Sequence, residues 1–401
     1  MSDFPVRNCP VCKNHNNQFL FKQEFANYSD GGLMDEYDVV ICSSCGAGYA
    51  SGIPSQFEFD RYYETMSKYE HGYRSGEVSD VDKARFSQVV DLVERYLKKD
   101  DRIVDIGCAT GALLAEFQKR GFNNIKGYDP SKECSEAALR LYGIKVAISS
   151  ISSLSEVSES ADLVIMTGVL EHLADVDQSI LIIKKLLAKK GMIYFEVPDA
   201  TRYDEWFSAP FQFFSMEHVN FFSPLSLSNL LYRHGYEVVF SQRVTRYLSS
   251  NSVEPAIAGL YRYECDHREL TKDDESKYRL EKYITKSYLL DQKIKSIISV
   301  LVENQVPLVI WGAGTHTLRL MRTSELSKAN IVGILDSNSR YHDKKLMGFP
   351  ITSPNNYNNS EVTILISSQV AENEIKQYII EKLRWKNNII CFYEGASLDS
   401  L

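Results

Sequence analysis

Residues 103–111 read as a short apolar strand that breaks into a glycine turn. Gly107 and Gly111 allow positive φ and let a ligand approach the backbone, and an apolar helical pattern follows them. The turn lacks the third glycine of a dinucleotide-binding fingerprint and the Lys-Ser/Thr ending of a phosphate-binding loop. Asp105, inside the strand end, would repel a phosphate but attract a cationic aminoacyl group. The pattern therefore favours S-adenosylmethionine over NAD or ATP as the ligand.

Two further strand ends carry residues that are typical of a site for a nucleoside-containing cofactor. Asp129 ends the next apolar segment, at the place where a carboxylate recognises ribose in nucleotide-binding sheets. Residues 168–173, with the sequence Gly-Val-Leu-Glu-His-Leu, follow a third buried-type strand. In this order the three signatures resemble the class I S-adenosylmethionine-dependent methyltransferases over residues 80–245. The alternative is a doubly wound domain whose turn binds nothing.

The resemblance implies a cofactor site spread over these turns. Asp105 and the backbone of residues 107–111 would hold the methionyl part, and Asp129 would bind the ribose hydroxyls. Two tyrosines from an aromatic segment, 56–80, would face the cofactor if that segment forms an irregular cap; a wrap packed on the core is the equally weighted alternative. The expected cofactor-binding residues are Asp105, Gly107, Cys108, Ala109, Gly111, Asp129, Pro130, Gly168, Tyr69 and Tyr73.

Methyl transfer requires alignment of the acceptor with the sulfonium carbon and usually a base for the acceptor's proton. In residues 211–224, Glu217 and His218 stand among phenylalanines just after a cleft-forming strand. Because histidine titrates near neutrality, His218 is the expected general base, with Glu217 beside it. The alternative for His218 is a core histidine that orients the next helix. His172 is the third catalytic candidate, and it would alternatively only shape the methyl pocket.

Two CxxC pairs stand near the amino terminus and indicate a metal site. Cys9 and Cys12 form the first pair, and Cys42 and Cys45 form the second. Four thiolates in this pattern are typical of tetrahedral zinc and leave no open coordination position, so the expected Zn²⁺ is structural. The expected strands around it offer too small a core to fold without the metal. We therefore expect a zinc-binding module over residues 1–55.

Length and composition limit the function classes. With 401 residues, 44% hydrophobic and 24% charged, the chain is typical of a globular protein of two or three domains. No run approaches the ~20 apolar residues that span a bilayer, and the first residues do not resemble a signal peptide. A formal charge of −8 argues against a nucleic-acid partner. We expect a cytoplasmic protein with a small-molecule substrate and no membrane or nucleic-acid partner.

Strand and helix patterns alternate through the centre of the chain, which predicts a mostly parallel sheet with ligands at the carboxyl ends of its strands. The expected fold class is α/β: a class I methyltransferase doubly wound sheet with an N-terminal zinc module and a C-terminal Rossmann-like lobe. The expected division is zinc module 1–55, aromatic cap 56–80, methyltransferase core 81–245, helical connector 246–305 and C-terminal lobe 306–401.

The C-terminal lobe repeats the strand-turn-helix pattern of the core. A glycine turn at 312–314 follows an apolar strand, and Asp336 ends the next strand. The turn lacks a third glycine, so dinucleotide binding is only one possibility. Binding the nucleotide or sugar part of a substrate, or packing against the core, are the alternatives that fit this weak signal better.

The arrangement along nearly the whole chain resembles the zinc-containing sugar C-methyltransferases. The features that carry this resemblance are the four-cysteine module, the class I core, Glu217-His218 followed by Phe221-Phe222-Ser223-Pro224, and the glycine-turn lobe. The resemblance implies methyl transfer to a nucleotide-linked sugar, such as a keto-sugar, in polysaccharide or natural-product biosynthesis. It also implies that a histidine and a tyrosine of a Tyr-x-Glu-His pattern deprotonate the sugar beside its carbonyl.

Two departures from that family leave the acceptor atom open. Ser215 stands where the family has its tyrosine, and residues 312–316 replace a glycine-alanine run with a lysine. An oxygen or nitrogen acceptor on a sugar or another small molecule is therefore an alternative to carbon, since one base such as His218 would suffice. An RNA methyltransferase and a non-catalytic cofactor-binding protein are the remaining alternatives, and the negative charge argues against the first.

Overall fold

The computed structural model describes residues 4–29, 31–65, 79–206, 209–249, 252–264, 268–357 and 362–393. Tyr69 and Tyr73, two of the expected cofactor residues, lie outside the described residues. The chain forms two compact units. The first comprises Met1–Leu20, Asp38–Tyr203 and Glu217–Arg279, and the second comprises Phe21–Tyr37, Asp204–Met216 and Leu280–Leu401. The division passes through strands β1 (Asn17–Glu24) and β2 (Glu36–Cys42) and through helix α7 (Glu275–Glu303).

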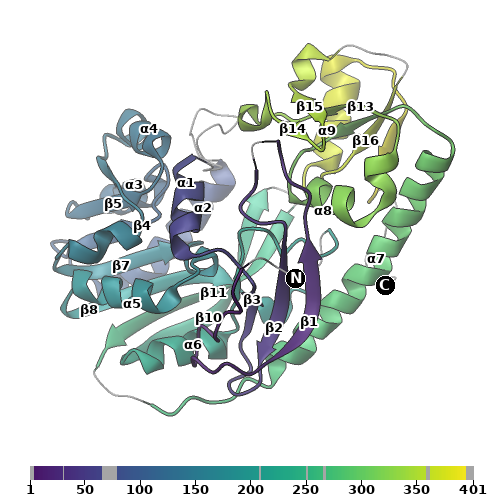
Figure 1. The fold of residues 1–401 in the computed structure, drawn as a ribbon. Helices are drawn as coiled ribbons and strands as arrows, with labels where there is room; N and C mark the ends of the chain where they lie inside the picture. The colour runs from purple at the N-terminus through teal and green to yellow at the C-terminus, as the bar shows by residue number, and fades with distance from the viewer. Residues whose placement is uncertain are drawn as a thin grey trace. The chain divides into compact units, whose positions relative to one another are not determined.

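A seven-stranded sheet organises the first unit, in the order β10-β11-β8-β7-β4-β5-β6 (Figure 1). Five neighbouring strands are parallel, and the β10–β11 hairpin adds two antiparallel strands at one edge. The doubly wound α/β sheet expected from the sequence is therefore confirmed. The strands are β4 (Ile103–Ile106), β5 (Ile125–Asp129), β6 (Val146–Ile148), β7 (Ala161–Thr167), β8 (Leu187–Pro198), β10 (Tyr236–Ser249) and β11 (Ser252–Tyr263).

Helices cover both faces of this sheet, because its central strands are apolar on both sides. Alternate residues of β4 enter different cores: Ile103 packs with α2, α3 and α4, whereas Val104 and Ile106 pack with α5 and α6. Each strand is thus fixed between two layers, and its carboxyl end is held in a defined place. The helices are α2 (Asp80–Val93), α3 (Ala112–Lys119), α4 (Lys132–Tyr142), α5 (Val176–Leu186) and α6 (Pro224–Arg233).

Two expectations about secondary structure are wrong. Residues 246–249 and 252–263 were expected in a helical connector, but they belong to strands β10 and β11, and the long helix α7 begins only at Glu275. Ala256–Tyr261 pair with β8 and are buried within the sheet. This tertiary contact decides the secondary structure here, against the helix expected from the local sequence. The segment expected as an irregular cap begins with a regular helix, α1 (Gln56–Thr65).

The N-terminal module joins the loop that carries the catalytic candidates. Strand β3 (Gly48–Ser51) pairs antiparallel with β9 (Asn220–Phe221), which begins two residues after His218. Cys9, Cys42 and Cys45 lie in the same core cluster as the helices α5 and α6. The cysteine module is thus an integral part of this unit's packing.

The second unit contains a six-stranded sheet in the order β14-β15-β13-β12-β16-β17. Strands β15, β13, β12, β16 and β17 are parallel, and α8 (Thr315–Thr323) follows the glycine turn, as the expected Rossmann-like lobe requires. Its remaining elements are β12 (Leu308–Trp311), β13 (Ile331–Leu335), β14 (Lys345–Leu346), β15 (Phe349–Thr352), β16 (Thr363–Ile366), α9 (Glu372–Gln377) with a π-helical continuation (Tyr378–Leu383), and β17 (Ile389–Cys391). Among the described residues of the whole chain, no helix has the length and apolar character needed to cross a membrane.

A buried ion pair fastens the β10–β11 hairpin. Arg246 is 7% exposed and lies opposite Glu254 in the strand register, with Nε and Nη2 both donating to Oε2 of that carboxylate. Glu196, at the end of β8, lies 4.0 Å from Arg246 and 3.1 Å from Arg85 of α2. Burial alone would lower the pKa of Arg246, but the carboxylates of Glu254, Glu171 and Glu196 raise it. The guanidinium is therefore held in its charged form.

We expect Glu254→Gln to lower the free energy of unfolding by about 3 kcal/mol, because it leaves the buried charge of Arg246 without its nearest partner. Urea denaturation followed by circular dichroism measures this change. Glu237→Gln is the matched control, since Glu237 pairs with the half-exposed Arg268 and an exposed pair contributes little. Equal losses in the two variants would contradict the role of the buried pair.

Candidate functional site

The turn after β4 takes the strained geometry that its small residues allow. Gly107 and Gly111 have φ of +71° and +73°, and Ala109 also has a positive φ of 47°. A Cβ on Gly107 would lie only 2.5 Å from the side chain of Val169, so a larger residue has no room there. The turn therefore needs glycine at position 107 for both conformation and space.

Asp105 is a buried acid in β4, the strand that leads into this turn. Its side chain is 2% exposed, and Oδ1 has no hydrogen-bond partner among the described residues. Burial raises the pKa of Asp105 well above its ordinary value, the nearby Asp129 raises it further, and Arg85 opposes both. A buried carboxylate oxygen of this kind is costly unless a cationic or donor group satisfies it. The site thus fits the cationic amino group of S-adenosylmethionine.

Cys108 and Asp129 both belong to the structure of this turn. The Cys108 side chain is buried in the core and would lie 2.6 Å from a Cβ on Gly127, so only its backbone remains for the turn. Asp129 accepts hydrogen bonds from the backbone N–H groups of Ala109 (2.8 Å) and Ser131 (2.9 Å). The carboxylate of Asp129 therefore fixes the glycine turn, and its expected binding of ribose stays a prediction, as does the role of the adjacent Pro130.

The second unit repeats this arrangement of a strand-end acid and a glycine turn. Asp336 accepts hydrogen bonds from the backbone N–H groups of Ala313 and Asn338, each at 2.8 Å. A cavity of about 190 Å³ beside the turn is lined by Gly312, Gly314, Thr315, His316, Asp336, Ser367, Ser368, Gln369, Val370, Ala209 and Gln212. Burial, the largest influence, lowers the pKa of His316 to about 4, so this histidine is neutral near pH 7.

Three of the side chains near the ends of β7 and β9 gather into one cluster. One ligand atom each from Glu171, His172 and His218 lie within 4.8 Å of one another. The two imidazole rings lie edge to face, with centroids 4.8 Å apart, and Nε2 of His172 is 4.0 Å from Oε1 of Glu171. The structure thus brings together His172 and His218, which the sequence named separately.

Two tyrosines of helix α1 extend this cluster. The hydroxyl of Tyr63 lies 2.8 Å from Nδ1 of His172, which is also 3.1 Å from the backbone oxygen of Glu217. Tyr62 donates a hydrogen bond of 3.0 Å to the Glu217 carboxylate. The sequence analysis missed both tyrosines as site residues, because they were two of many aromatic residues at irregular spacing in residues 56–80. A helical spacing of the aromatic residues at 56–65 is the one sequence signal that could have placed Tyr62 and Tyr63 on a common helix.

Hydrogen bonds from two residues hold the loops of this cluster together. The side-chain amide of Asn220 donates to the backbone oxygens of Leu170 and Leu173, each at 2.9 Å. Arg7 donates to the Asn220 side chain (2.8 Å), to the backbone oxygen of Val219 (3.1 Å) and to the loop at residues 173–174. These bonds fix the segment with His172 against the segment with His218. Sequence reasoning gave no indication of either residue.

The electrostatics of the cluster are those of a buried site. Glu171 is 1% exposed, and its Oε2 has no hydrogen-bond partner in the part of the chain that the structure describes. Burial raises the pKa of Glu171, while His172 and Arg246 oppose the shift. Burial also raises the pKa of Tyr63 well above its ordinary value, so this phenol stays protonated at neutral pH.

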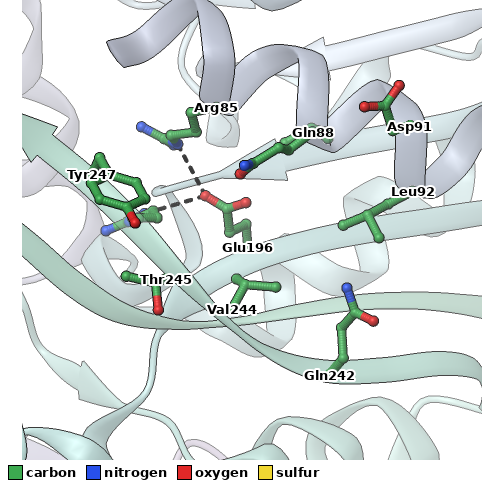
Figure 2. Close-up of a pocket in the computed structure, with 11 residues that line it drawn as sticks. Arg85, Gln88, Asp91, Leu92, Glu196, Gln242, Val244, Thr245 and Tyr247 are labelled. Atoms are coloured by element: carbon green, nitrogen blue, oxygen red, sulfur yellow. Dashed lines mark hydrogen bonds and ion pairs between the residues drawn. The ribbon is translucent and has the colours of Figure 1, made fainter.

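A cavity of about 440 Å³ lies between α2, β10 and the end of β8 (Figure 2). Figure 2 shows Arg85 and Glu196 directed toward each other at one side of this cavity. Arg246 also lines it, and Nη1 of Arg246 would lie 3.4 Å from a Cβ on Gly168, at the turn after β7. The cavity is large enough for a small ligand and adjoins one of the expected cofactor turns.

The four cysteines of the N-terminal module converge as their spacing predicts. Their sulfur atoms all lie within 4.8 Å of one another, with Cys9 and Cys45 3.6 Å apart and Cys12 and Cys42 3.4 Å apart. Four thiolates bound tetrahedrally to zinc at 2.3 Å have sulfur–sulfur distances of about 3.8 Å. The donor set and its spacing therefore fit a tetrahedral zinc ion.

Comparison with protein families supports the assignment of the central sheet. Residues 81–240, which contain the glycine turn, Asp129 and the Glu171-His172 motif, match the family described as a methyltransferase domain. Residues 81–240 are a methyltransferase domain. The class I S-adenosylmethionine-dependent family expected from the sequence is thereby confirmed for this segment, whereas the sugar C-methyltransferase subtype stays a prediction. Residues 304–390, in the C-terminal lobe, match a second family described as C2185-like, N-terminal.

Curated relatives of the methyltransferase domain differ in their substrates. A ribosomal protein L11 methyltransferase from Thermotoga neapolitana is 34% identical over 115 residues, which are 25% of this chain and 44% of that protein. A ubiquinone biosynthesis O-methyltransferase from Rhizobium etli is 31% identical over 98 residues, 23% of this chain and 39% of that protein. The chain thus spans less than half the length of these relatives.

Solved structures with some likeness to this chain include two methyltransferases. The 1,6-didemethyltoxoflavin-N1-methyltransferase of Burkholderia thailandensis has a TM-score of 0.41 and 18% identity, covering 57% of this chain and 95% of that one. The magnesium protoporphyrin IX methyltransferase of Synechocystis has a TM-score of 0.37 and 14% identity, covering 53% and 98%.

We expect Asn220→Ala to lower the free energy of unfolding by about 2 kcal/mol, because buried carbonyl groups of the 170–173 loop lose their donor. Thermal unfolding measures this loss. Asn330→Ala removes a single hydrogen bond of 3.3 Å at an exposed position and serves as the control, with little expected change. A variant at position 220 as stable as the control would show that the loop is held by other contacts.

Proposed function

We propose that this protein is an S-adenosylmethionine-dependent methyltransferase that acts on a small molecule. The observation that supports this proposal most directly is Oδ1 of Asp105, which is buried at the glycine turn of a methyltransferase domain and has no hydrogen-bond partner among the described residues. This oxygen would accept hydrogen bonds from the cationic amino group of the methionyl part. The backbone of residues 107–111 would line the same part of the cofactor.

Arg85 is suited to bind the other end of the same aminoacyl group. Its guanidinium is close enough to Asp105 to oppose the rise in the pKa of that carboxyl, and Nε is bonded to Glu196 at 3.1 Å. An ammonium bound at Asp105 and a carboxylate bound at Arg85 would pair opposite charges at both ends of the group. Sequence reasoning did not single out Arg85, because a lone arginine on an amphipathic helix carries no motif.

Activation of the acceptor is assigned to the cluster of Glu171, His172 and His218. His218 as general base, receiving the acceptor's proton, is the simplest form of this activation. The edge-to-face contact of the two imidazole rings and the bond of His172 to Tyr63 would fix the direction of the reactive groups. Glu217, bonded to Tyr62, would act by holding α1 against this segment.

The acceptor is proposed to be a nucleotide-linked sugar, either a keto-sugar or a hydroxy-sugar. This substrate class follows from the resemblance to sugar C-methyltransferases in the cysteine module, the Glu217-His218 segment and the C-terminal lobe. Ser215 replaces the tyrosine of that pattern. An oxygen acceptor therefore remains as suitable as a carbon acceptor.

The decisive experiment is mass spectrometry of reactions with labelled S-adenosylmethionine and a panel of nucleotide-linked keto-sugars and hydroxy-sugars. We expect a labelled methyl on one of these sugars, and its stability to base separates carbon-linked from oxygen-linked products. His218→Ala should reduce transfer at least about 100-fold, the range for loss of acid–base catalysis. Asp105→Ala should instead weaken cofactor binding about 10-fold or more, measured by calorimetry.

The affinity of His218→Ala for S-adenosylmethionine is measured as a control, and an unchanged value shows that the variant is folded. Near-wild-type turnover in this variant would remove His218 from acceptor activation. If no sugar is methylated while the cofactor still binds, the proposed substrate class is contradicted. The protein would then be a methyltransferase that acts on another small molecule.

We also propose that the four-cysteine module holds one structural zinc ion. All four ligand positions would be thiolates, so no position remains for a substrate. The module carries β3, which pairs with β9 beside His218, and α6 donates from Arg233 to the backbone oxygens of Pro10 and Val11. Loss of the metal would therefore disturb the segment that carries the catalytic candidate.

Elemental analysis of the purified protein should find zinc in the wild type and a loss of about one zinc per chain in Cys42→Ser. The variant should also unfold at a lower temperature, because metal binding supplies folding energy and the cysteines lie in the core of the first unit. Cys391→Ser, a cysteine outside the module, is the control and should keep its zinc. Retention of the same zinc content in Cys42→Ser would overturn this assignment.

A further inference from the structure

We propose that Glu171, His172 and His218 form a binding site for a second metal, a divalent cation that contacts the acceptor's oxygen. This inference rests on the proposed methyltransferase function and deepens it. One carboxylate and two imidazoles whose ligand atoms lie within 4.8 Å of one another supply three donors in one place. Mixed nitrogen and oxygen donors of this kind bind divalent cations such as Mn²⁺, Fe²⁺ and Zn²⁺. With only three protein ligands, coordination positions remain for water or substrate.

The unsatisfied carboxylate of Glu171 is the first independent support. Glu171 is 1% exposed, and its Oε2 has no hydrogen-bond partner among the described residues. A carboxylate oxygen buried without a partner costs stability, and the nearest histidine nitrogen is 4.0 Å from the other oxygen, which is too far for a hydrogen bond. A cation held by both oxygens of this carboxylate would satisfy Oε2 and would also take Nε2 of His172 as a ligand.

The surroundings of His172 are those of a metal ligand. Its Nδ1 faces the backbone oxygen of Glu217 (3.1 Å) and the hydroxyl of Tyr63 (2.8 Å), and Nε2 faces Glu171. Histidine ligands generally donate the second ring N–H to a carbonyl or carboxylate, which fixes the ring and leaves the other nitrogen for the metal. The bond to Glu217 therefore orients Nε2 into the cluster.

The cation would change how the acceptor is activated. An acceptor oxygen bound to a divalent cation has a lowered pKa, so a hydroxyl can release its proton to water at neutral pH. The oxygen then forms a bond to the methyl carbon while the carbon–sulfur bond breaks, and the sulfur keeps the electron pair as S-adenosylhomocysteine forms. A keto-sugar would present its carbonyl oxygen in the same way. In this scheme His218 is a ligand and not a free base.

Manganese is the suitable probe, because four thiolates favour zinc over the harder Mn²⁺. Protein carrying only the zinc of the cysteine module, verified by elemental analysis, is titrated with Mn²⁺, and the free ion is measured by electron paramagnetic resonance. We expect one Mn²⁺ per chain in the wild type and at least about 10-fold weaker binding in Glu171→Gln, His172→Gln and His218→Gln. Purified protein holding a second, tightly bound zinc that all three variants lack would equally support the site.

The controls match the variants in chemistry. His15→Gln removes an exposed imidazole bonded to Asn8, and Glu237→Gln removes a partly exposed carboxylate paired with Arg268. Both should bind Mn²⁺ like the wild type. Unchanged affinity for S-adenosylmethionine in the three cluster variants would show that they are folded, so that weaker Mn²⁺ binding cannot be ascribed to unfolding.

The outcomes separate this inference from the proposed function, because the Mn²⁺ titration needs no substrate. Mn²⁺ binding that depends on the three residues, with methyl transfer increasing as the cation is added, supports both. Cation binding without transfer to any acceptor supports the site and contradicts the proposed function. Methyl transfer by a protein that binds neither Mn²⁺ nor a second zinc, or binds them equally well in the three variants, overturns the cation site and returns His218 to the role of base.

Discussion

The hydrogen bonds of Asn220 and Arg7 are the constraint on which the candidate site depends. The loop after β7 and the segment before β9 are separated by more than forty residues, and the short 3-10 helix of the first (Leu170–His172) does not by itself align its side chains with the other. Asn220 binds the carbonyl groups of the first loop, and Arg7 binds both. Burial lowers the pKa of Arg7 to about 10, yet the group remains charged at neutral pH. One amide and one guanidinium thus convert two loops into a single rigid support for His172 and His218.

The two units have the same pair of backbone hydrogen bonds to an acid beside their glycine turns. Asp129 and Asp336 each accept two backbone hydrogen bonds, one from the turn and one from the residue two positions ahead. An acid at the end of the second strand is therefore required by the turn itself, whatever the turn binds. Asp105 differs because one of its oxygens is buried with no partner among the described residues. The orphaned oxygen is the more specific indication of a ligand.

Much of the fold and part of the site could be predicted from the sequence. The cysteine pairs, the glycine turn and the alternation of strands and helices are local patterns, and the structure places the four sulfur atoms together as their spacing indicates. The β10–β11 hairpin was missed because the burial of Ala256–Tyr261 arises from pairing with β8, a contact distant in sequence. Tyr63 and Arg7 were missed for the same reason. Their partners, His172 and the 173–174 loop, are more than one hundred residues away.

Buried charge explains why the site should be completed by cations. Arg246 and Glu254 compensate each other, so that pair costs the fold little as long as both remain. Asp105 and Glu171 are buried carboxyl groups whose pKa values are raised chiefly by burial. At neutral pH their ionisation therefore lowers the free energy of unfolding. This loss is absent at low pH, where both groups are protonated. A ligand that brings positive charge to either group recovers this cost only in the folded state, and it therefore binds more tightly and stabilises the fold by mass action. The cost of these buried carboxylates and the proposed affinity for cationic ligands would be two results of the same burial.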